Sequence, residues 1–367
     1  MSTYTIQHGT FNHFSLGGTS AEVGAAMAQA LQSNQPYLNF FTSADADPAR
    51  LDCTSFGQME EQFERACPGV VDEIHAFAAA LNTRPERIMY YQISSLKQTN
   101  CSQMVALPAI TRGGRVLVGR SYEWKPAEDD LCLCTTAVTG KLRHIGFTCM
   151  LMGRMDGLNE RGLSVTMSGG MAAGLPHEWT RKTGLNFWVA LRGLLENCAT
   201  TREALERLRQ YPPASNVIFL IADRSGEAAV AELSAGEMEI HLTGPDGPDE
   251  ALIATNHYTL PGMAPLNRHQ FILDNSLPRR KAILAAIAQD RHGVTRDTFR
   301  AVLTREIPDG CFGPYYDQGF GTLWSMLIDL SALELEICFG APSHNPWRTF
   351  TLDTPGGASY PAQFPQR

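Results

Sequence analysis

The hydrophobic pattern of the chain changes at residue 101, and this change constrains its fold more than any other feature. Before it, apolar residues recur at helical spacing, most clearly from Met59 to Leu81. After it, short apolar or alternating runs such as 131–138, 162–168 and 217–222 are separated by turn residues. Helices are expected among them, at about 184–197, 201–210, 276–289 and 296–304. Strands with helices grouped around them predict an α+β fold in which helices lie outside a largely antiparallel double sheet.

The 367 residues allow two domains or one large layered domain, and we predict one integrated domain. Its parts are a helix-rich segment of residues 1–100, a core of residues 101–352 and a polar tail of residues 353–367, rich in Pro and Gly. The first segment is expected to open with a short strand at Tyr4–Ile6. Residues 88–95 could form a strand or a helix.

Composition and charge exclude several classes of function. The formal net charge is −8 and no basic block is present, so nucleic acid is not expected as a partner. No stretch approaches the roughly 20 apolar residues that span a bilayer. The N-terminus lacks the basic start and apolar run of a secretory signal. We therefore expect a cytoplasmic protein without a membrane partner, and the sequence leaves open whether it forms a homo-oligomer.

The nine cysteines are an odd number in a chain without a signal sequence, which favours free thiols over a disulfide framework. Cys132 and Cys134 would share one face of a strand. Zinc ligation would need a second pair of ligands, and none stands nearby in the sequence. We expect packing residues here, and no metal or organic cofactor.

Cys101 differs from the other cysteines because its neighbours Asn100, Ser102 and Gln103 are all polar. Its place at the boundary between the two patterns suits a nucleophile, and suits a buried structural thiol equally well. A cut before Cys101 would give it a free α-amine. The ordinary pKa of that amine, roughly 7.7–8.0, lets it act as a base near neutral pH.

Arg120 and Glu123 follow within the next predicted hairpin. An arginine can stabilise a thiolate or a substrate carbonyl, and the carboxylate could accept from the amine of an N-terminal residue. Strand alternation places Arg120 and Tyr122 on one face and Glu123 on the other, unless a bulge intervenes. The alternative is a surface ion pair of little energetic value.

Further polar residues stand near predicted strand ends. We expect a turn at Asp156-Gly157, and Gly169-Gly170 would let backbone N–H groups approach an oxyanion, or simply close a hairpin. Asn256 could donate its amide to an oxyanion, whereas His257 could be a base but is better explained as a hydrogen-bonded histidine. In the segment 274–280, Ser276 or Asn275 is expected as a helix N-cap, with Pro278 in the first turn.

The ordered set of these motifs resembles a known family. Cys101, Gly-Arg-x-x-Glu at 119–123, Gly-Leu-Asn-Glu-x-Gly-Leu at 157–163, Thr-Asn-His at 255–257 and Asn-Ser-x-x-Arg at 275–279 are similar to the penicillin acyltransferase-like N-terminal-nucleophile hydrolases. This family includes isopenicillin N acyltransferase and linear amide hydrolases, and the choloylglycine hydrolases are related to it. The resemblance implies a four-layer αββα fold and a precursor that cuts itself between Asn100 and Cys101.

The resemblance also implies roles for residues. Cys101 would be the nucleophile that carries a thioester, Arg120 and Glu123 the arginine and acid, and Asn256 the oxyanion asparagine. The positions expected near substrate are Gly169, His257, Arg279 and Ser325. The substrate would be a small-molecule amide, whose acyl group passes to water or to an amine.

Two residues depart from the family pattern. Asn100 stands where glycine is usual before the cut, and Glu123 replaces aspartate. Glycine relaxes a strained conformation, and asparagine tolerates positive φ better than most residues. These departures keep two alternatives open: an uncleaved Cys–His hydrolase with His144 or His257 as base, and a catalytically inactive binding protein on the same scaffold.

Overall fold

The computed structural model describes residues 5–31, 38–39, 42, 56–94, 100–149, 151–170, 186–213, 215–234, 237–267 and 270–366. Tyr4 of the expected first strand, and residues 184–185 of the helix expected at 184–197, lie outside these ranges. Among the helices within them, none combines the length and the apolar character that crossing a bilayer requires.

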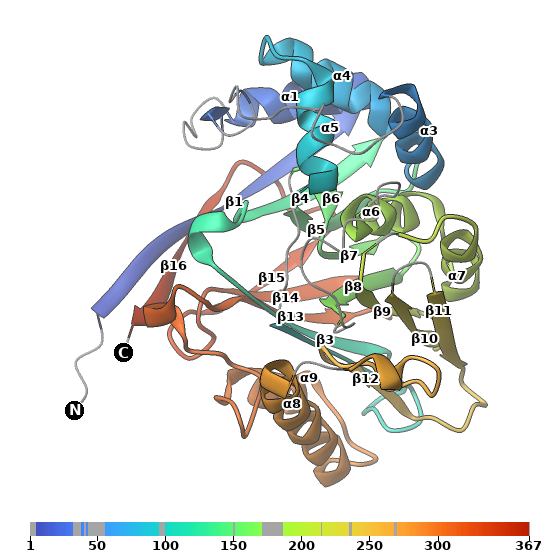
Figure 1. Cartoon of the computed structure of the whole chain (residues 1–367). Coiled ribbons are helices and arrows are strands. Elements are labelled where there is room, and N and C mark those ends of the chain that lie inside the picture. The colour runs from blue at the N-terminus through green and yellow to red at the C-terminus, as the bar shows by residue number, and fades with distance from the viewer. Residues whose placement is uncertain are drawn as a thin grey trace.

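Two β-sheets form the centre of the molecule (Figure 1). The larger contains β1 (Thr5–Gly18), β4 (Cys132–Val138), β5 (His144–Cys149), β6 (Gly153–Arg154), β7 (Asp156–Asn159), β8 (Leu163–Gly169), β9 (Val217–Asp223), β10 (Ala228–Ser234), β11 (Glu237–Thr243) and β16 (Ser359–Gln366). Its order is β11-β10-β9-β8-β7-β5-β4-β1-β16, with β6 paired to β5. The smaller contains β2 (Asn100–Ala106), β3 (Leu117–Trp124), β12 (Ala251–Ala254), β13 (Gly321–Asp329), β14 (Glu334–Phe339) and β15 (Trp347–Thr351), in the order β12-β2-β3-β13-β14-β15.

Helices cover the outer face of each sheet. On the smaller sheet lie α8 (Gln270–Gln289) and α9 (Arg296–Thr304). On the larger sheet lie α6 (Phe187–Asn197) and α7 (Thr201–Gln210), together with the group α1 (Ser20–Leu31), α3 (Phe56–Ala66), α4 (Val70–Ala80) and α5 (Pro85–Ser94). Figure 1 shows the resulting order of helices, smaller sheet, larger sheet and helices. The predicted four-layer αββα fold is therefore confirmed.

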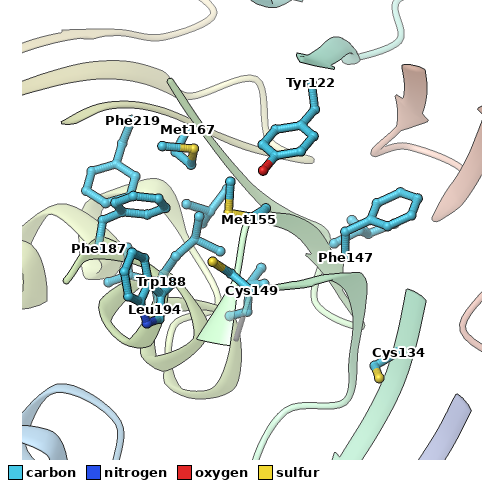
Figure 2. Packing of buried hydrophobic residues seen from close by; sticks show 14 of the residues in the cluster. Tyr122, Cys134, Phe147, Cys149, Met155, Met167, Phe187, Trp188, Leu194 and Phe219 are labelled. Atoms are coloured by element: carbon cyan, nitrogen blue, oxygen red, sulfur yellow. The ribbon is translucent and has the colours of Figure 1, made fainter. Parts of the chain in front are cut away.

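The pairing is antiparallel, as predicted, except between β1 and β4, which run parallel. Side chains that alternate inward from both sheets fill the space between them. Trp324 stacks between Tyr122 at 3.9 Å and Phe147 at 4.0 Å, measured between ring centroids. Figure 2 shows Tyr122 and Phe147 with Met155 and Met167 in this core. The aromatic stack ties β3 and β13 to the larger sheet.

Both ends of the chain differ from the prediction. β1 runs from Thr5 to Gly18 and not only to Ile6, because Phe11 and His13 continue an alternating buried face. The expected polar tail contains β16, which pairs with β1 and buries Ala362 and Phe364. Two prolines in β16 conceal this strand in the sequence, and its place at the sheet edge tolerates them. Residues 88–94, left open by the sequence, belong to α5.

A buried ion-pair network joins the segment before residue 100 to the rest of the chain. Arg192 of α6 donates to both carboxylate oxygens of Glu73 of α4, at 2.5 and 2.7 Å, and to Glu196 at 2.8 Å. Lys141 reaches Glu196 at 2.7 Å. Buried charges are tolerated when they are paired in this bidentate manner. Because β1 also lies between β4 and β16, a chain cut before Cys101 would remain one folded unit.

Candidate active site

Cys101 lies near the start of β2, with its side chain between the two sheets. It stands opposite Tyr122 of β3 and is fully buried. Gln103, two residues on and therefore on the same face, donates to Ser168 of the larger sheet at 2.8 Å. Ser102 points the other way and accepts from Arg279 of α8 at 3.0 Å. Strand alternation thus directs the thiol toward the larger sheet and Ser102 toward the helices.

Arg120 is a cation beside the Cys101 thiol. It forms a side-chain hydrogen bond with Cys101, and its Nε donates to Asp156 Oδ2 at 3.3 Å. Trp324 Nε1 donates to the same oxygen at 2.9 Å. Burial would lower the pKa of Arg120, but the charges of Cys101 and Asp156 raise it, so the guanidinium stays charged. A fixed cation beside a thiol favours the thiolate, which is the nucleophilic form.

Asp156 is a site residue that sequence reasoning missed. The turn predicted at Asp156-Gly157 is instead strand β7, and the chain reverses at residues 160–162, where Gly162 has a φ of 85°. Asn159 Oδ1 organises that reversal by accepting from Arg161 N and Leu163 N, each at 3.0 Å. The pairing of Asp156 with Arg120 joins strands of different sheets. No local pattern in the sequence carries that information.

Asn256 lies beside Cys101, as predicted. The carbonyl oxygen of its side chain faces Cys101, however, and not the amide N–H that we expected to donate to an oxyanion. β12 pairs with β2, so the residues that follow β12 reach the start of β2. Asn256 Oδ1 accepts from Cys101 N at 2.9 Å and from Arg279 at 2.7 Å, and Nδ2 donates to Gly169 O at 3.0 Å. Two donors face the oxygen, so the carbonyl end must point toward them.

Gly169 accordingly offers its carbonyl to Asn256, whereas we expected its N–H to face an oxyanion. The close approach that requires glycine occurs at Gly170. A Cβ atom there would lie 2.2 Å from the hydroxyl oxygen of Tyr258. The Gly-Gly pair is therefore explained by two contacts: Gly170 packs against Tyr258, and the Gly169 carbonyl accepts a hydrogen bond from Asn256.

Arg279 lies inside α8 and reaches the backbone of the candidate nucleophile. Its guanidinium donates to the Cys101 carbonyl and to Asn256, and Nη1 lies 3.9 Å from Glu123 Oε2. Because α8 begins at Gln270, Ser276 is not an N-cap and Pro278 is internal to the helix, contrary to the prediction. The helix thus presents a buried cation to the start of β2.

Glu123 faces away from the thiol, as strand alternation predicted. Its Oε1 accepts from Ser121 at 2.5 Å and Thr322 at 3.5 Å, and Oε2 has no hydrogen-bond partner among the described residues. Burial raises the pKa of Glu123 to about 6, although Arg279 and the hydrogen bond from Ser121 oppose the rise. In the strand register Glu123 stands opposite Asn100. The carboxylate therefore lies beside the residue that precedes Cys101.

The raised pKa of Glu123 predicts a pH-dependent stability. The folded state binds this proton more tightly than the unfolded chain, whose carboxyl has an ordinary pKa of 4.5. Stability should therefore fall as pH rises from about 4.5 through about 6, by about 2 kcal/mol for a shift of this size. Urea unfolding of the wild type and Glu123→Gln, which lacks the titration, measures this loss as a change in their difference. A difference that stays constant across this pH range would contradict the assignment.

Asn100 has an ordinary strand conformation. It is the first residue of β2 and is half-buried. It is not among the described non-glycine residues with positive φ. The tolerance of asparagine for positive φ is therefore not used at this position.

The remaining candidates are His257, His144 and Ser325. His257 bonds through Nδ1 to Ser276 at 2.7 Å and Thr255 at 3.2 Å, and burial with Arg280 and Arg279 lowers its pKa to about 4. His144 lies in β5, where burial with Arg154 lowers its pKa to about 3. At these pKa values both imidazoles are neutral near pH 7. Ser325 of β13 is buried opposite Ser121, on the Glu123 side of the sheet.

Within the described ranges no three His, Cys, Asp or Glu side chains are grouped so that they could hold a metal ion. Cys132 and Cys134 lie 3.6 Å apart, measured between their sulfur atoms, and both are buried. The candidate active site consists of Cys101, Arg120, Asp156, Asn256, Arg279 and Glu123.

Comparison with protein families gives one match. The family described as acyl-coenzyme A:6-aminopenicillanic acid acyl-transferase matches residues 110–344, which are 235 of the 367 residues. The matched region contains Arg120, Glu123, Asn256 and Arg279, whereas Cys101 precedes it. No curated protein matches the sequence.

Among the solved structures that are similar to this chain, three illustrate the low sequence identity. An N-acylethanolamine-hydrolyzing acid amidase ortholog from Caenorhabditis elegans is 14% identical, with 63% of this chain and 93% of that chain covered and a TM-score of 0.45. A mutant conjugated bile acid hydrolase from Clostridium perfringens is 14% identical, with 71% and 96% covered and a TM-score of 0.44. Penicillin V acylase from Agrobacterium tumefaciens is 17% identical, with 71% and 90% covered and a TM-score of 0.39.

Proposed function

Because the chain belongs to the acyl-coenzyme A:6-aminopenicillanic acid acyl-transferase family, we propose that it is a self-processing amidase or acyltransferase with Cys101 as its nucleophile. The observation that carries the proposal is the hydrogen bond between Arg120 and the Cys101 side chain, with Arg120 held in turn by Asp156. This is the arrangement that a buried thiolate needs, because its charge is costly without a fixed counter-charge.

The first step of the proposal is self-cleavage. The Cys101 thiolate attacks the Asn100 carbonyl, the C–N bond breaks, and the nitrogen takes a proton to become the α-amine. Water then hydrolyses the thioester, which leaves a carboxylate on Asn100 and a free thiol on Cys101. Asn256 Oδ1, which accepts from the Cys101 backbone nitrogen, is positioned to hold the new amine.

The second step uses the amine as a base. Arg279 contacts both Asn256 and the Cys101 carbonyl, so its positive charge lies beside the amine and disfavours its protonation. The neutral amine takes the thiol proton, and the thiolate attacks the carbonyl of a small-molecule acyl donor. The leaving group departs with a proton, and an acyl thioester forms on Cys101. Water or an acceptor amine then releases the acyl group.

The test is detection of the acyl-enzyme. The protein is incubated with a panel of N-acyl p-nitroanilides and of acyl-coenzyme A thioesters, quenched in acid and analysed by intact mass and peptide mapping. The proposal expects one acyl group, located on Cys101, and release of p-nitroaniline or coenzyme A. An acyl group on another residue, or turnover without any adduct dependent on Cys101, would contradict it.

The alternatives are separated by the same experiment. An uncleaved Cys–His hydrolase would form the adduct on an intact chain. Against it, burial lowers the pKa of His144 to about 3, and His257 Nδ1 bonds to Ser276. A binding protein without activity, suggested by Asn100 and Glu123, would form no adduct with any donor. It would also leave Cys101 no more reactive toward iodoacetamide than an ordinary thiol.

A further inference from the structure

A hydrogen-bonded cluster around Ser276 lies directly behind Asn256. The Ser276 hydroxyl accepts from Asn256 N at 2.8 Å and His257 N at 3.2 Å. It donates to Thr255 Oγ1 at 2.8 Å and lies 2.7 Å from His257 Nδ1. All four residues are buried. Neither the N-cap role expected for Ser276 nor the catalytic base considered for His257 accounts for this arrangement.

We propose that Ser276 is a positioning residue whose hydroxyl clamps the turn at residues 255–257 and so fixes Asn256 against Cys101. The inference rests on the function proposed above. Ser276 and Arg279 are three residues apart on α8 and therefore lie on one helix face. Ser276 holds the backbone of Asn256, and Arg279 holds its side chain. One helix thus fixes both ends of the residue that touches the Cys101 nitrogen.

The proton count of the cluster requires a neutral His257. A hydroxyl has one proton to donate and two lone pairs that can accept. The two backbone N–H groups fill both lone pairs of Ser276, so His257 Nδ1 cannot donate to that oxygen. Nδ1 therefore accepts, either from the Ser276 proton that Thr255 Oγ1 shares or from the Thr255 hydroxyl at 3.2 Å. The ring proton then resides on Nε2.

Burial and the charges of Arg280 and Arg279, the cations that face this ring, keep the imidazole neutral at physiological pH. Protonation would place an N–H against an oxygen that has no free lone pair. The clamp would therefore weaken in strong acid, as pH falls through about 4. His257 serves in this account as an acceptor in the cluster and not as the base of the reaction.

The experiment compares Ser276→Ala, Ser276→Thr, Asn256→Ala and the double variant Ser276→Ala/Asn256→Ala. Self-cleavage is followed by intact mass. The value of kcat/KM is measured with the best p-nitroanilide or acyl-coenzyme A substrate of the panel. Ser276→Ala should lower kcat/KM about 10- to 100-fold, by analogy with the loss of one preorganised donor. Ser276→Thr, which keeps the hydroxyl, should retain activity to within about fivefold. In the Asn256→Ala background the same change should cost less than about threefold, because both residues act through one contact.

A matched control is Ser331→Ala. The Ser331 hydroxyl also accepts a backbone N–H, from Val116 at 3.2 Å, but at the opposite end of β3 from Tyr122. This variant should stay within about threefold of the wild type. Wild-type activity in Ser276→Ala would overturn the proposal. Equal losses from Ser276→Ala in the presence and absence of Asn256 would overturn it too.

A second measurement does not depend on catalysis. Amide hydrogen exchange of a peptide spanning 252–260 should be at least about tenfold faster in Ser276→Ala than in the wild type and in Ser331→Ala, because the two clamped N–H groups lose their acceptor. Unchanged protection would overturn the clamp. A wild type that neither cleaves itself nor forms an acyl adduct would overturn the proposed function instead, while the exchange result still decides the clamp.

Discussion

Replacing Cys101 by alanine should leave a folded protein that neither cleaves itself nor forms an acyl adduct. The alanine has no sulfur to attack the Asn100 carbonyl or the acyl donor, and the thiol that bonds to Arg120 is lost. Loss of a nucleophile of this kind typically lowers turnover by more than about 10³-fold. Intact mass before and after incubation with acyl donors, together with p-nitroaniline release, measures both effects.

The matched control is Cys198→Ala. Cys198 is another buried thiol, at the end of α6, and burial raises its pKa to about 12. This variant should cleave itself before Cys101 and turn over substrate like the wild type. Self-cleavage or a covalent acyl adduct in Cys101→Ala would exclude Cys101 as the nucleophile.

Replacing Arg120 by methionine should lower kcat/KM by about 10²- to 10³-fold, the usual loss when a preorganised charge partner is removed. The side chain keeps a similar length but loses the charge beside the thiol. The pH at which Cys101 becomes reactive toward iodoacetamide should therefore rise. Peptide mapping of alkylated Cys101 across a pH series measures that shift directly.

Arg120→Met also leaves Asp156 as a buried charge without its partner, which could destabilise the fold. The double variant Arg120→Met/Asp156→Asn removes both charges and separates the two effects. We expect it to regain stability in urea unfolding and to remain as inactive as Arg120→Met. Recovered activity in the double variant would show that Arg120 acts only on stability.

Much of the fold follows from local sequence pattern. Period-two runs and turn residues placed most strands of both sheets. Helical spacing from Met59 to Leu81 predicted one helix over residues 57–80, which the structure divides into α3 and α4 at Gly69, where φ is 81°. The face assignment of Arg120 and Glu123 also held, because alternation along a strand is a local property. The order of weak motifs identified the family, which the match over residues 110–344 confirms.

The sequence did not reveal contacts that only the packing of distant elements creates. Asp156 became a partner of Arg120 because β7 and β3 meet across two sheets, and its Asp-Gly signal favoured a turn. The amide orientation of Asn256 depends on two donors, one from β2 and one from α8. β16 was concealed by Pro361 and Pro365, which only an edge position explains.

The central claim is that Cys101 becomes the N-terminus of a catalytic chain, and the intact mass of the purified wild type under denaturing conditions tests it most directly. The account predicts two chains, residues 1–100 and 101–367, with cysteine as the N-terminal residue of the second. A wild-type protein that remains one uncut chain, while it still forms an acyl adduct on Cys101, would contradict it.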